Sequence, residues 1–479
     1  MVRTNFDKWS KTKIVATIGP ASESIDILRR LALAGVSVFR LNFAHGDWAW
    51  HDTVYQRIRA VSEELQLPLA VLQDLGGPKL RLGELPGDKL DCVLGDQFRL
   101  VRQATGAEKE LTCSYTRLVD DLREDDQLLI ADGSVGMKVT RTGPGWAELE
   151  VTLPGEIRSR QGINTPNARL QLDSLTEKDL HDLDWTAAHD VDFVGLSFVR
   201  RPEDLDRLRS ELKKRGSKAQ IIAKIEKAEA LAALPAIVRQ ADAVMVARGD
   251  LGVEIDVARV PGEQKRIIDR CRQLGVPVIT ATQMLESMRT SNRPTRAEAS
   301  DVANAILDGT DAVMLSGETA SGNYPIEAVT TMNRIARETE RTMPPGKQLP
   351  VAAFHSSQLP DIVQAMVNAA RLLAEQVEAK LVVAATRSGM TALALAKSRN
   401  LTLTLGLSDN VATVRRLCLY WGVLPVYFKL TQPPSDYISR VCEWVAEQDL
   451  ARSGDRLIFL IGASWTDAGF NTVMVHEVP

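Results

Sequence analysis

Two acidic residues and a lysine near the middle of the chain could bind an anionic substrate through a divalent cation. Lys224 and Glu226 follow the apolar run 220–223, and Asp250 follows the apolar run 243–247. If both runs are buried strands, the two carboxylates end strands that lie close together and can share one ion, with Lys224 beside them. Carboxylate oxygens suit Mg2+, with Mn2+ as an alternative, and the ammonium adds a site for an oxygen-rich anion.

The elements that must position these groups form a regular alternation along the chain. Amphipathic helical stretches separate most of eight apolar runs, which are 13–19, 36–43, 68–75, 192–199, 219–226, 243–249, 277–284 and 312–318. Continuous apolar strands are typical of a parallel sheet that is covered on both faces. Eight such strands alternating with helices predict an α/β protein built on a (β/α)8 TIM barrel.

Polar groups fall at the ends of every predicted strand except the first and the fourth. They are Arg40, Asn42, Asp74, Lys224, Glu226, Asp250, Thr282, Ser316 and Glu318. A lone lysine or a single acidic pair at a strand end is more often a salt-bridge partner than part of a site. Six polar ends on one rim favour a shared site, because the carboxyl end of such a barrel is where its chemistry lies.

The alternation is interrupted once and ends before the C-terminus. More than a hundred residues separate the third and fourth strands, and short alternating patterns predict a small β-barrel inserted at the carboxyl face as a lid. We expect a catalytic barrel over residues 1–76 and 161–343 and a lid over 77–160. A C-terminal regulatory domain with a parallel α/β fold should follow over 344–479, with an edge strand at 471–478.

Composition excludes several other classes of protein. The net charge of −4 gives no electrostatic basis for binding nucleic acid or an anionic membrane, and no apolar run approaches the length of a membrane span. The five cysteines lie far apart and their number is odd, which is typical of reduced thiols. We therefore expect a cytoplasmic protein with no nucleic-acid or membrane partner.

Long segments of the chain resemble the pyruvate kinase family, in particular bacterial members that do not need K+. The segments are 12–22 (TKIVATIGPAS), 39–46 (FRLNFAHG), 74–81 (DLGGPKLR), 222–230 (IAKIEKAEA), 244–255 (VMVARGDLGVEI), 280–288 (TATQMLESM) and 294–325. This family transfers the phosphoryl group of phosphoenolpyruvate to ADP, giving pyruvate and ATP in the last step of glycolysis. The resemblance also implies the three-part architecture above and a homotetramer.

The resemblance assigns roles to the rim residues. Glu226 and Asp250 would hold Mg2+ against the substrate oxygens, and the backbone at Gly249, where a helix starts, would receive the substrate carboxylate. Thr282 would also contact this substrate. Lys224, with Arg40 and Arg81, would stabilise the phosphoryl group in transfer; ADP would lie between the barrel and the lid, near a group of residues that comprises Asn42, His45, Arg81 and Lys178.

A second step must deliver a proton to the enolate. A threonine hydroxyl is a poor acid, so we expect a water relayed through Thr282, Ser316 and Glu318. For Ser316 and Glu318 the alternative role is simple support of the eighth strand–helix loop, and the sequence does not decide between the two.

Three departures from the family pattern bear on monovalent cations. Ala44 replaces a serine, Leu75-Gly76 replaces Thr-Lys, and Lys79 replaces a glutamate, so one oxygen ligand is lost and an ammonium replaces a carboxylate. Family members with lysine at this position resemble K+-independent enzymes. We expect Lys79 to substitute for the cation and activity not to require K+.

A loop in the C-terminal domain resembles the family's sugar-phosphate loop. Its candidate residues are Thr386, Arg387, Ser388, Gly389 and Thr391, which precede an expected helix at 392–397. Hydroxyls and N–H groups at a helix N-terminus can hold a phosphate, although the pattern alone is more often an ordinary loop. Because Met390 replaces a basic residue, a sugar monophosphate or a nucleotide is expected as effector rather than a bisphosphate.

Two other functions compete with this interpretation. One is a Mg2+-dependent lyase or aldolase acting on pyruvate-like enolates, which would need no ADP site or lid. The other is a catalytically silent relative, which would be expected to have lost Lys224 or Asp250.

Overall fold

A closed barrel of eight parallel strands forms the centre of the protein. The structure is a computed structural model that describes residues 9–166, 168, 170–343, 361–429, 434–461 and 471–479. In order around the barrel the strands are β1 (Lys13–Ile18), β17 (Ala312–Leu315), β16 (Val278–Ala281), β15 (Ala243–Ala247), β14 (Gln220–Ile225), β13 (Phe193–Leu196), β3 (Ala70–Asp74) and β2 (Val36–Asn42). All eight predicted runs contain a strand, which confirms the (β/α)8 barrel.

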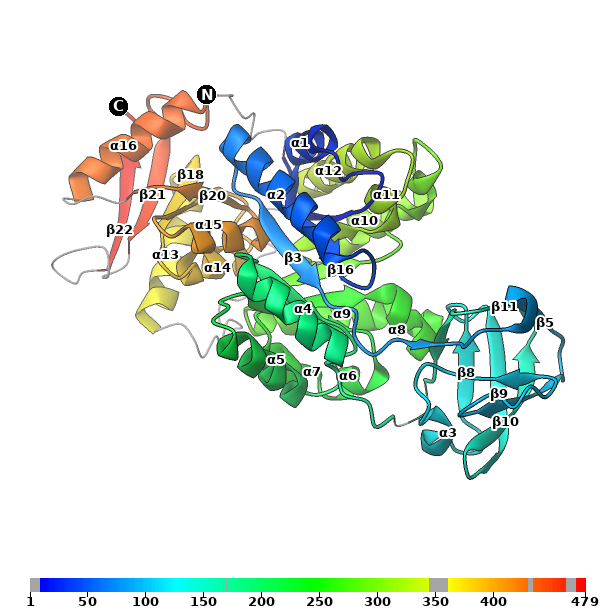
Figure 1. The fold of residues 1–479 in the computed structure, drawn as a ribbon. Helices are drawn as coiled ribbons and strands as arrows, with labels where there is room; N and C mark the ends of the chain where they lie inside the picture. The colour runs from blue at the N-terminus through cyan, green and yellow to red at the C-terminus, as the bar shows by residue number, and fades with distance from the viewer. Residues whose placement is uncertain (1–8, 167, 169, 344–360, 430–433, 462–470) are drawn as a thin grey trace.

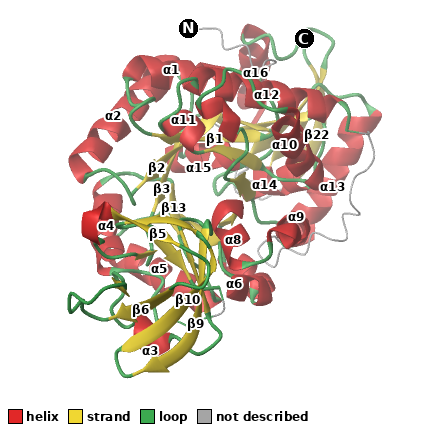
Figure 2. Ribbon diagram, turned by 90° about the vertical axis from the view of Figure 1, so that its right-hand side faces the viewer, coloured by secondary structure: helices red, strands yellow, loops and turns green. Residues whose placement is uncertain are grey.

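Helices surround these strands (Figure 2). The main ones are α1 (Ile25–Ala34), α2 (Trp48–Leu65), α4 (Glu177–Ala188), α5 (Pro202–Lys214), α7 (Leu234–Gln240), α9 (Val260–Gln273), α10 (Arg296–Asp308) and α12 (Pro325–Arg341). Their bounds follow local signals: the Thr295 hydroxyl caps α10, and Gly309 ends it with φ 102°. Shorter helices, including α6 (Ala228–Ala232), α8 (Arg248–Glu254) and α11 (Gly317–Ala320), lie at the carboxyl rim.

The inserted segment forms its own β-barrel with its own apolar core. One sheet has the strand order β4 (Leu80–Arg81), β12 (Gly162–Asn164), β8 (Gln127–Ile130), β9 (Val135–Gly143), β10 (Trp146–Leu153), β6 (Gln97–Val101) and β7 (Glu110–Leu111). A bridge between Leu82 and Cys113 joins its two edges, and the Ser114 N–H donates to the Arg81 carbonyl at 2.8 Å. The predicted small β-barrel is therefore present as an insertion after β3.

The C-terminal part is a second α/β unit. Its sheet has the order β20 (Val423–Tyr427), β19 (Leu403–Ser408), β18 (Leu381–Ala385), β21 (Arg456–Ile461) and β22 (Thr472–Glu477). The first four strands are parallel, and β22 is the predicted edge strand, running antiparallel to β21. Helices α13 (Asp361–Gln376), α14 (Met390–Lys397), α15 (Val411–Arg416) and α16 (Pro434–Glu447) pack on it. The predicted start of this domain at 344 lies outside the described residues.

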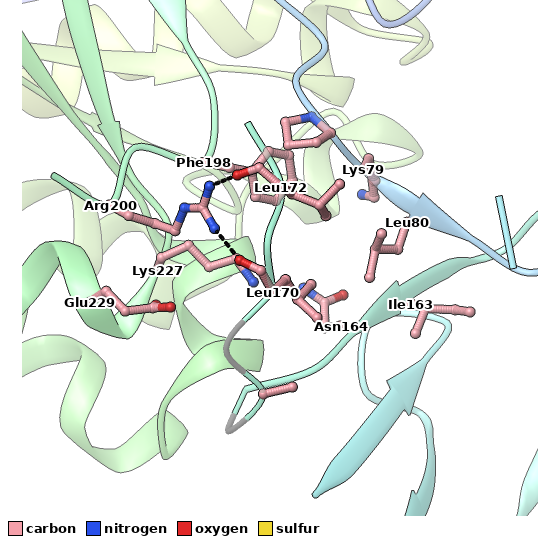
Figure 3. Close-up of a pocket in the computed structure, with 12 residues that line it drawn as sticks. Lys79, Leu80, Ile163, Asn164, Leu170, Leu172, Phe198, Arg200, Lys227 and Glu229 are labelled. Atoms are coloured by element: carbon pink, nitrogen blue, oxygen red, sulfur yellow. Dashed lines mark hydrogen bonds between the residues drawn. The ribbon is translucent and has the colours of Figure 1, made fainter. Parts of the chain in front are cut away.

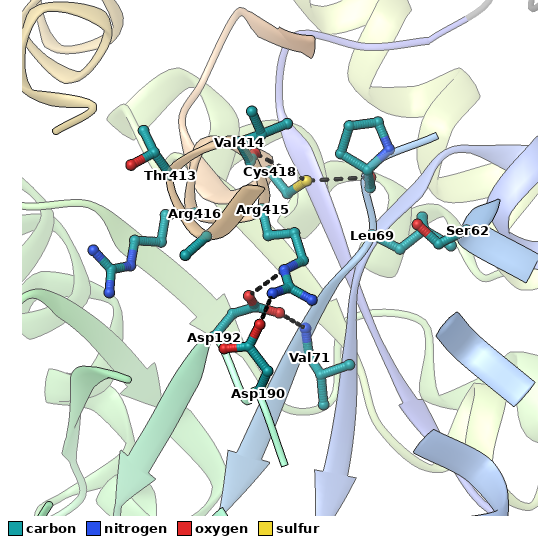
Figure 4. Close-up of polar contacts among 12 residues, drawn as sticks. Ser62, Leu69, Val71, Asp190, Asp192, Thr413, Val414, Arg415, Arg416 and Cys418 are labelled. Atoms are coloured by element: carbon teal, nitrogen blue, oxygen red, sulfur yellow. Dashed lines mark hydrogen bonds and ion pairs between the residues drawn. The ribbon is translucent and has the colours of Figure 1, made fainter. Parts of the chain in front are cut away.

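Buried ion pairs attach this unit to the amino ends of the barrel strands, opposite the lid (Figure 1). The Arg415 guanidinium lies 3.0 Å from Asp192 Oδ1, and the Val71 N–H donates to Asp192 Oδ2 at 2.8 Å (Figure 4). Lys397 Nζ lies 2.5 Å from Asp311 Oδ2, with both side chains 1% exposed. The carboxyl rim is thus left open toward the lid.

All five cysteines are buried and free, as predicted for reduced thiols. No helix among the described residues combines the length and the apolar character that crossing a membrane would require.

Candidate active site

Lys224 is a buried cation at the carboxyl rim. It follows Ile222 on the same face of β14, and Ile222 packs inside the barrel, so the lysine side chain enters the mouth of the barrel. Its Nζ donates to Ser197 Oγ at 2.6 Å and lies 2.9 Å from Glu226 Oε1. Burial alone would lower the pKa of Lys224, but the surrounding carboxylates raise it above its ordinary value. The ammonium therefore stays charged.

Asp74 joins Lys224 to a second cation, Arg40. Asp74 Oδ1 lies 3.2 Å from Lys224 Nζ, and Oδ2 accepts from Arg40 Nε at 2.7 Å. The Arg40 guanidinium also donates to Thr17 Oγ1 at 2.9 Å. Although burial would raise the pKa of Asp74, Lys224 and Arg40 hold it below its ordinary value. A permanent carboxylate thus fixes both cations at the rim.

Glu226 and Asp250 form the acidic pair that the sequence predicts. Glu226 is 1% exposed, and its Oε2 accepts from the Phe198 N–H at 2.7 Å. Burial and the nearby charge of Asp250 raise the pKa of Glu226, while Lys224 opposes the rise. Two adjacent carboxylates with this mutual repulsion fit a hard divalent cation, which would relieve it.

The acidic pair would provide only part of a coordination shell. Among the described residues, no three His, Cys, Asp or Glu side chains gather where they could hold an ion. Mg2+ commonly takes one or two carboxylates from the protein and the remainder from substrate oxygens and water. The residues present therefore fit a cation that binds together with an oxygen-rich substrate.

Thr282 contacts the start of α8 directly. The Gly249 N–H donates to Thr282 Oγ1 at 2.7 Å, so the N–H that we expected to receive a substrate carboxylate is bonded to this hydroxyl. Helix α8 begins at Arg248, one residue earlier than predicted. Thr282 has φ 68°, a left-handed conformation that is costly for a β-branched residue. Arg248 stabilises it by donating to the Thr282 carbonyl at 2.8 Å and to Asp301 at 2.7 Å.

Glu318 is fully buried and binds two loops. Its oxygens accept from the Ser316 N–H at 2.7 Å and the Leu285 N–H at 3.0 Å. Burial raises the pKa of Glu318 despite these bonds. Since both oxygens are engaged by backbone, this geometry favours loop support over proton relay for Glu318. The Ser316 hydroxyl is buried with no hydrogen-bond partner among the described residues.

Several cations gather near the base of the lid. Burial lowers the pKa of His45, and the positive charges of Arg81, Arg40 and Lys79 add to that shift. Lys79 Nζ lies 4.0 Å from Asp250 Oδ1, so its one described ion pair is with this proposed metal ligand.

The other residues expected near the nucleotide lie on the same side of the rim. Asn42 Oδ1 accepts from the Ala44 N–H at 3.2 Å at the end of β2. Lys178 Nζ donates to the Phe43 carbonyl at 2.8 Å and pairs with Asp182 at 2.5 Å. The Lys178 side chain is 60% exposed and contacts the loop that carries His45.

The structure corrects the expectation that the fourth strand contributes no polar group to the rim. Ser197, directly after β13, accepts from Lys224 and donates to the Leu75 carbonyl at 2.8 Å. Its neighbour Phe198, with φ 56°, turns its N–H toward Glu226. The only sequence signal was a serine within the apolar run 192–199, which is too common to stand out.

The candidate effector loop joins β18 to α14, which begins at Met390 rather than at residue 392. Thr386 Oγ1 accepts from the Gly389 N–H at 2.9 Å within the loop, and the Arg387 carbonyl accepts from Thr413 Oγ1 of α15 at 2.7 Å. Gly389 has φ 89°, a conformation that suits glycine. The loop is a compact turn before a helix.

Comparisons with known proteins agree on one family. The model described as "Pyruvate kinase, barrel domain" matches residues 9–329, and "Pyruvate kinase, alpha/beta domain" matches residues 364–476. A pyruvate kinase of Agrobacterium vitis is 42% identical over 465 residues, covering 96% of this chain and 95% of that protein. One from Clostridium acetobutylicum is 38% identical over 471 residues, covering 98% and 99%.

A solved structure agrees with these relatives. The crystal structure of a pyruvate kinase from Cryptosporidium parvum superposes with a TM-score of 0.92 at 32% identity. The match covers 99% of this chain and 97% of that one. The lyase alternative receives no support from these matches.

Proposed function

The chain belongs to the pyruvate kinase family of enzymes, whose substrates are phosphoenolpyruvate and ADP, and we propose that the rim around Lys224 is the place of phosphoryl transfer. The observation that carries this proposal is the buried ammonium of Lys224, held charged between Asp74 and Glu226 at the mouth of the barrel. A loose phosphoryl-transfer transition state needs positioning and positive charge above all.

The two enclosed cations would share that task. Lys224 and Arg40 hold opposite oxygens of Asp74, so both are fixed before any substrate arrives. We assign to them the oxygens of the phosphoryl group as it leaves the enolpyruvate oxygen, with Arg81 approaching from the lid. Preorganised cations in a site shielded from water stabilise such charge without the cost of reorganisation.

Glu226 and Asp250 would hold Mg2+, or Mn2+ in its place. When bound, such a cation supplies a Lewis acid that draws the substrate oxygens together and offsets their charge. The first turn of α8 would take the substrate carboxylate, which requires Thr282 to release the Gly249 N–H. Gly249 suits that approach because it has no side chain.

Thr282 would then serve the proton step. The enolate gains a proton at its methylene carbon, and the Thr282 hydroxyl, beside the acidic pair, would orient the water that delivers it. We retain Ser316 as the next group in that relay, because its buried hydroxyl lacks a partner among the described residues. For Glu318 we favour support of the loop.

ADP would occupy the side of the rim that carries Asn42, His45, Arg81 and Lys178, under the lid.

We further propose that Lys79 makes K+ unnecessary, since it places an ammonium within 4.0 Å of Asp250. The effector loop of Thr386, Arg387, Ser388, Gly389 and Thr391 would bind a sugar monophosphate or a nucleotide in a cytoplasmic homotetramer. Titrating such compounds against phosphoenolpyruvate saturation tests this; no response to any of them would contradict it.

The first experiment measures ADP-dependent pyruvate formation from phosphoenolpyruvate and Mg2+ in a buffer free of K+. Rapid turnover that is lost in Lys224→Met is the expected result. Activity that appears only after K+ is added would contradict the role of Lys79 and leave the reaction intact. Pyruvate formation that does not depend on ADP would overturn the assignment in favour of a lyase.

A further inference from the structure

The two proposed metal ligands belong to different elements, so their spacing depends on how those elements are joined. Glu226 follows the end of β14, whereas Asp250 lies in the first turn of α8. Among the described residues, no hydrogen bond or ion pair joins either carboxylate directly to the other's element. A two-ligand site needs a second contact that sets the distance between its halves, because small displacements weaken metal binding.

Each ligand is followed by one member of a buried ion pair. Lys227 is the next residue after Glu226, and Glu254 lies one helical turn beyond Asp250 on α8. Lys227 Nζ lies 2.6 Å from Glu254 Oε1, and the two side chains are 15% and 2% exposed. The pair therefore joins the two ligand-bearing elements away from solvent, where removing one partner is costly.

Two further contacts hold this pair in place. The Asn164 amide, on the strand by which the chain leaves the lid, donates to Glu254 Oε1 at 3.4 Å. Lys227 Nζ lies over the Phe198 ring, 5.8 Å from its centroid, and the Phe198 N–H donates to Glu226. Figure 3 shows Lys227, Phe198 and Asn164 lining the small cavity between barrel and lid. Glu226 is therefore linked to α8 through Phe198, Lys227 and Glu254.

We propose that Glu254 is a positioning residue that sets the spacing of Glu226 and Asp250 through Lys227. The inference rests on the proposed metal site and adds to it a residue that touches neither the ion nor the substrate. Losing the carboxylate charge leaves Lys227 buried without its counter-ion, so the segment after β14 shifts relative to α8. Metal affinity should fall even though both ligands remain.

The test measures direct binding of Mn2+ in the absence of substrate. The concentration of free Mn2+ is monitored by electron paramagnetic resonance. Glu254→Gln preserves the size of the side chain and should weaken Mn2+ affinity by about 10- to 100-fold, as is typical for residues behind metal ligands. Asp311→Asn is the matched control, because it removes an equally buried carboxylate that pairs with Lys397 at the other end of the barrel. The control should lower the melting temperature but leave Mn2+ affinity within about twofold.

A folded Glu254→Gln variant that binds Mn2+ within about twofold of wild type would overturn the inference. If that variant does not fold, the double variant Lys227→Ala with Glu254→Ala removes both the buried charges and the contact between the two elements, and it is judged by the same criterion. Asp250→Asn distinguishes a failure of the metal assignment from a failure of the positioning role. Mn2+ binding that survives in Asp250→Asn would overturn the metal assignment itself, whereas binding lost there and kept in Glu254→Gln overturns the positioning role alone.

Discussion

Lys224 and Asp74 form an ion pair of 3.2 Å across the mouth of the barrel, although their strands, β14 and β3, are not neighbours in the sheet. Strand β13 runs between them, and Ser197 at its end accepts from Lys224. One ammonium therefore binds the ends of three strands together. The Lys224 ammonium is the proposed phosphoryl ligand and also stabilises the contact between these strand ends. Its mutation should therefore affect activity and stability separately.

Replacing Lys224 by Met should lower kcat by about 10³-fold, because a preorganised cation is removed from a charged transition state. The melting temperature should fall as well, since Asp74 and Glu226 lose a buried counter-ion. A coupled assay for pyruvate and a thermal unfolding curve measure the two effects. Lys265→Met removes a half-exposed lysine that pairs with the buried Asp308; it is the control and should leave kcat unchanged. Full activity in Lys224→Met would contradict the assignment.

Replacing Thr282 by Ala should slow the proton step by about 10²-fold, the range of general acid–base effects. The KM for phosphoenolpyruvate should not rise, because the change frees the Gly249 N–H to bind the substrate carboxylate. Exchange of pyruvate methyl hydrogens with D2O, in the presence of ATP and Mg2+, isolates this step by NMR. Thr290→Ala, at an exposed site on the same loop region, serves as the control. Exchange at the wild-type rate in Thr282→Ala would exclude the hydroxyl from the proton step.

Replacing Lys79 by Glu should reduce activity in K+-free buffer and create a partial recovery on adding K+. The reason is that the cation near Asp250 is lost and a carboxylate able to bind K+ takes its place. The measurement compares turnover in K+ with turnover in a large organic cation at equal ionic strength. Lys138→Glu, in the lid, controls for the change in net charge. A wild-type enzyme strongly activated by K+ would contradict the role given to Lys79.

The pH dependence of stability should carry a contribution from Lys13. Burial lowers the pKa of this lysine to about 8, and its Nζ donates to the Val423 carbonyl at 2.6 Å between barrel and C-terminal unit. Because its pKa in the unfolded chain is near 10.4, the unfolded state binds more protons between these values, and stability rises with pH there. Between pH 7.5 and pH 9.5, the urea midpoint of wild type should therefore rise relative to the urea midpoint of Lys13→Met. Lys213→Met, on the exposed face of α5, should show no such trend.

The barrel was predictable because its strands are continuous apolar runs of the length that a parallel sheet requires. The rim was predictable in part, since Lys224, Glu226 and Asp250 end such runs and differ sharply from them in polarity. Ser197 was missed because a serine within an apolar run carries little signal until a lysine 27 residues away is folded against it. The residues that join the two edges of the lid sheet were equally hidden, because Leu82 and Cys113 meet in a bridge outside any strand.

The hydrogen bond that the Gly249 N–H donates to Thr282 could also not be predicted from the sequence. A glycine at a helix start indicates an open anion site, but the left-handed turn at Thr282 brings a hydroxyl onto the same N–H. That turn depends on Arg248, which bonds to the Thr282 carbonyl from the other side. Contacts of this kind follow from tertiary packing across two strand ends, not from either segment alone.

The lid enters and leaves the barrel through β4 and β12, which pair with each other, Arg81 opposite Gly162 and Leu80 opposite Ile163. The two crossings thus form a single ribbon, and every described strand of the barrel has its hydrogen-bonded neighbours within the barrel. The segment from 82 to 161 is consequently a cassette. It could be replaced by the corresponding segment of a relative, or removed, while the eight-stranded barrel stays closed. The residues proposed for the transfer lie outside that segment, so it can be exchanged without altering them.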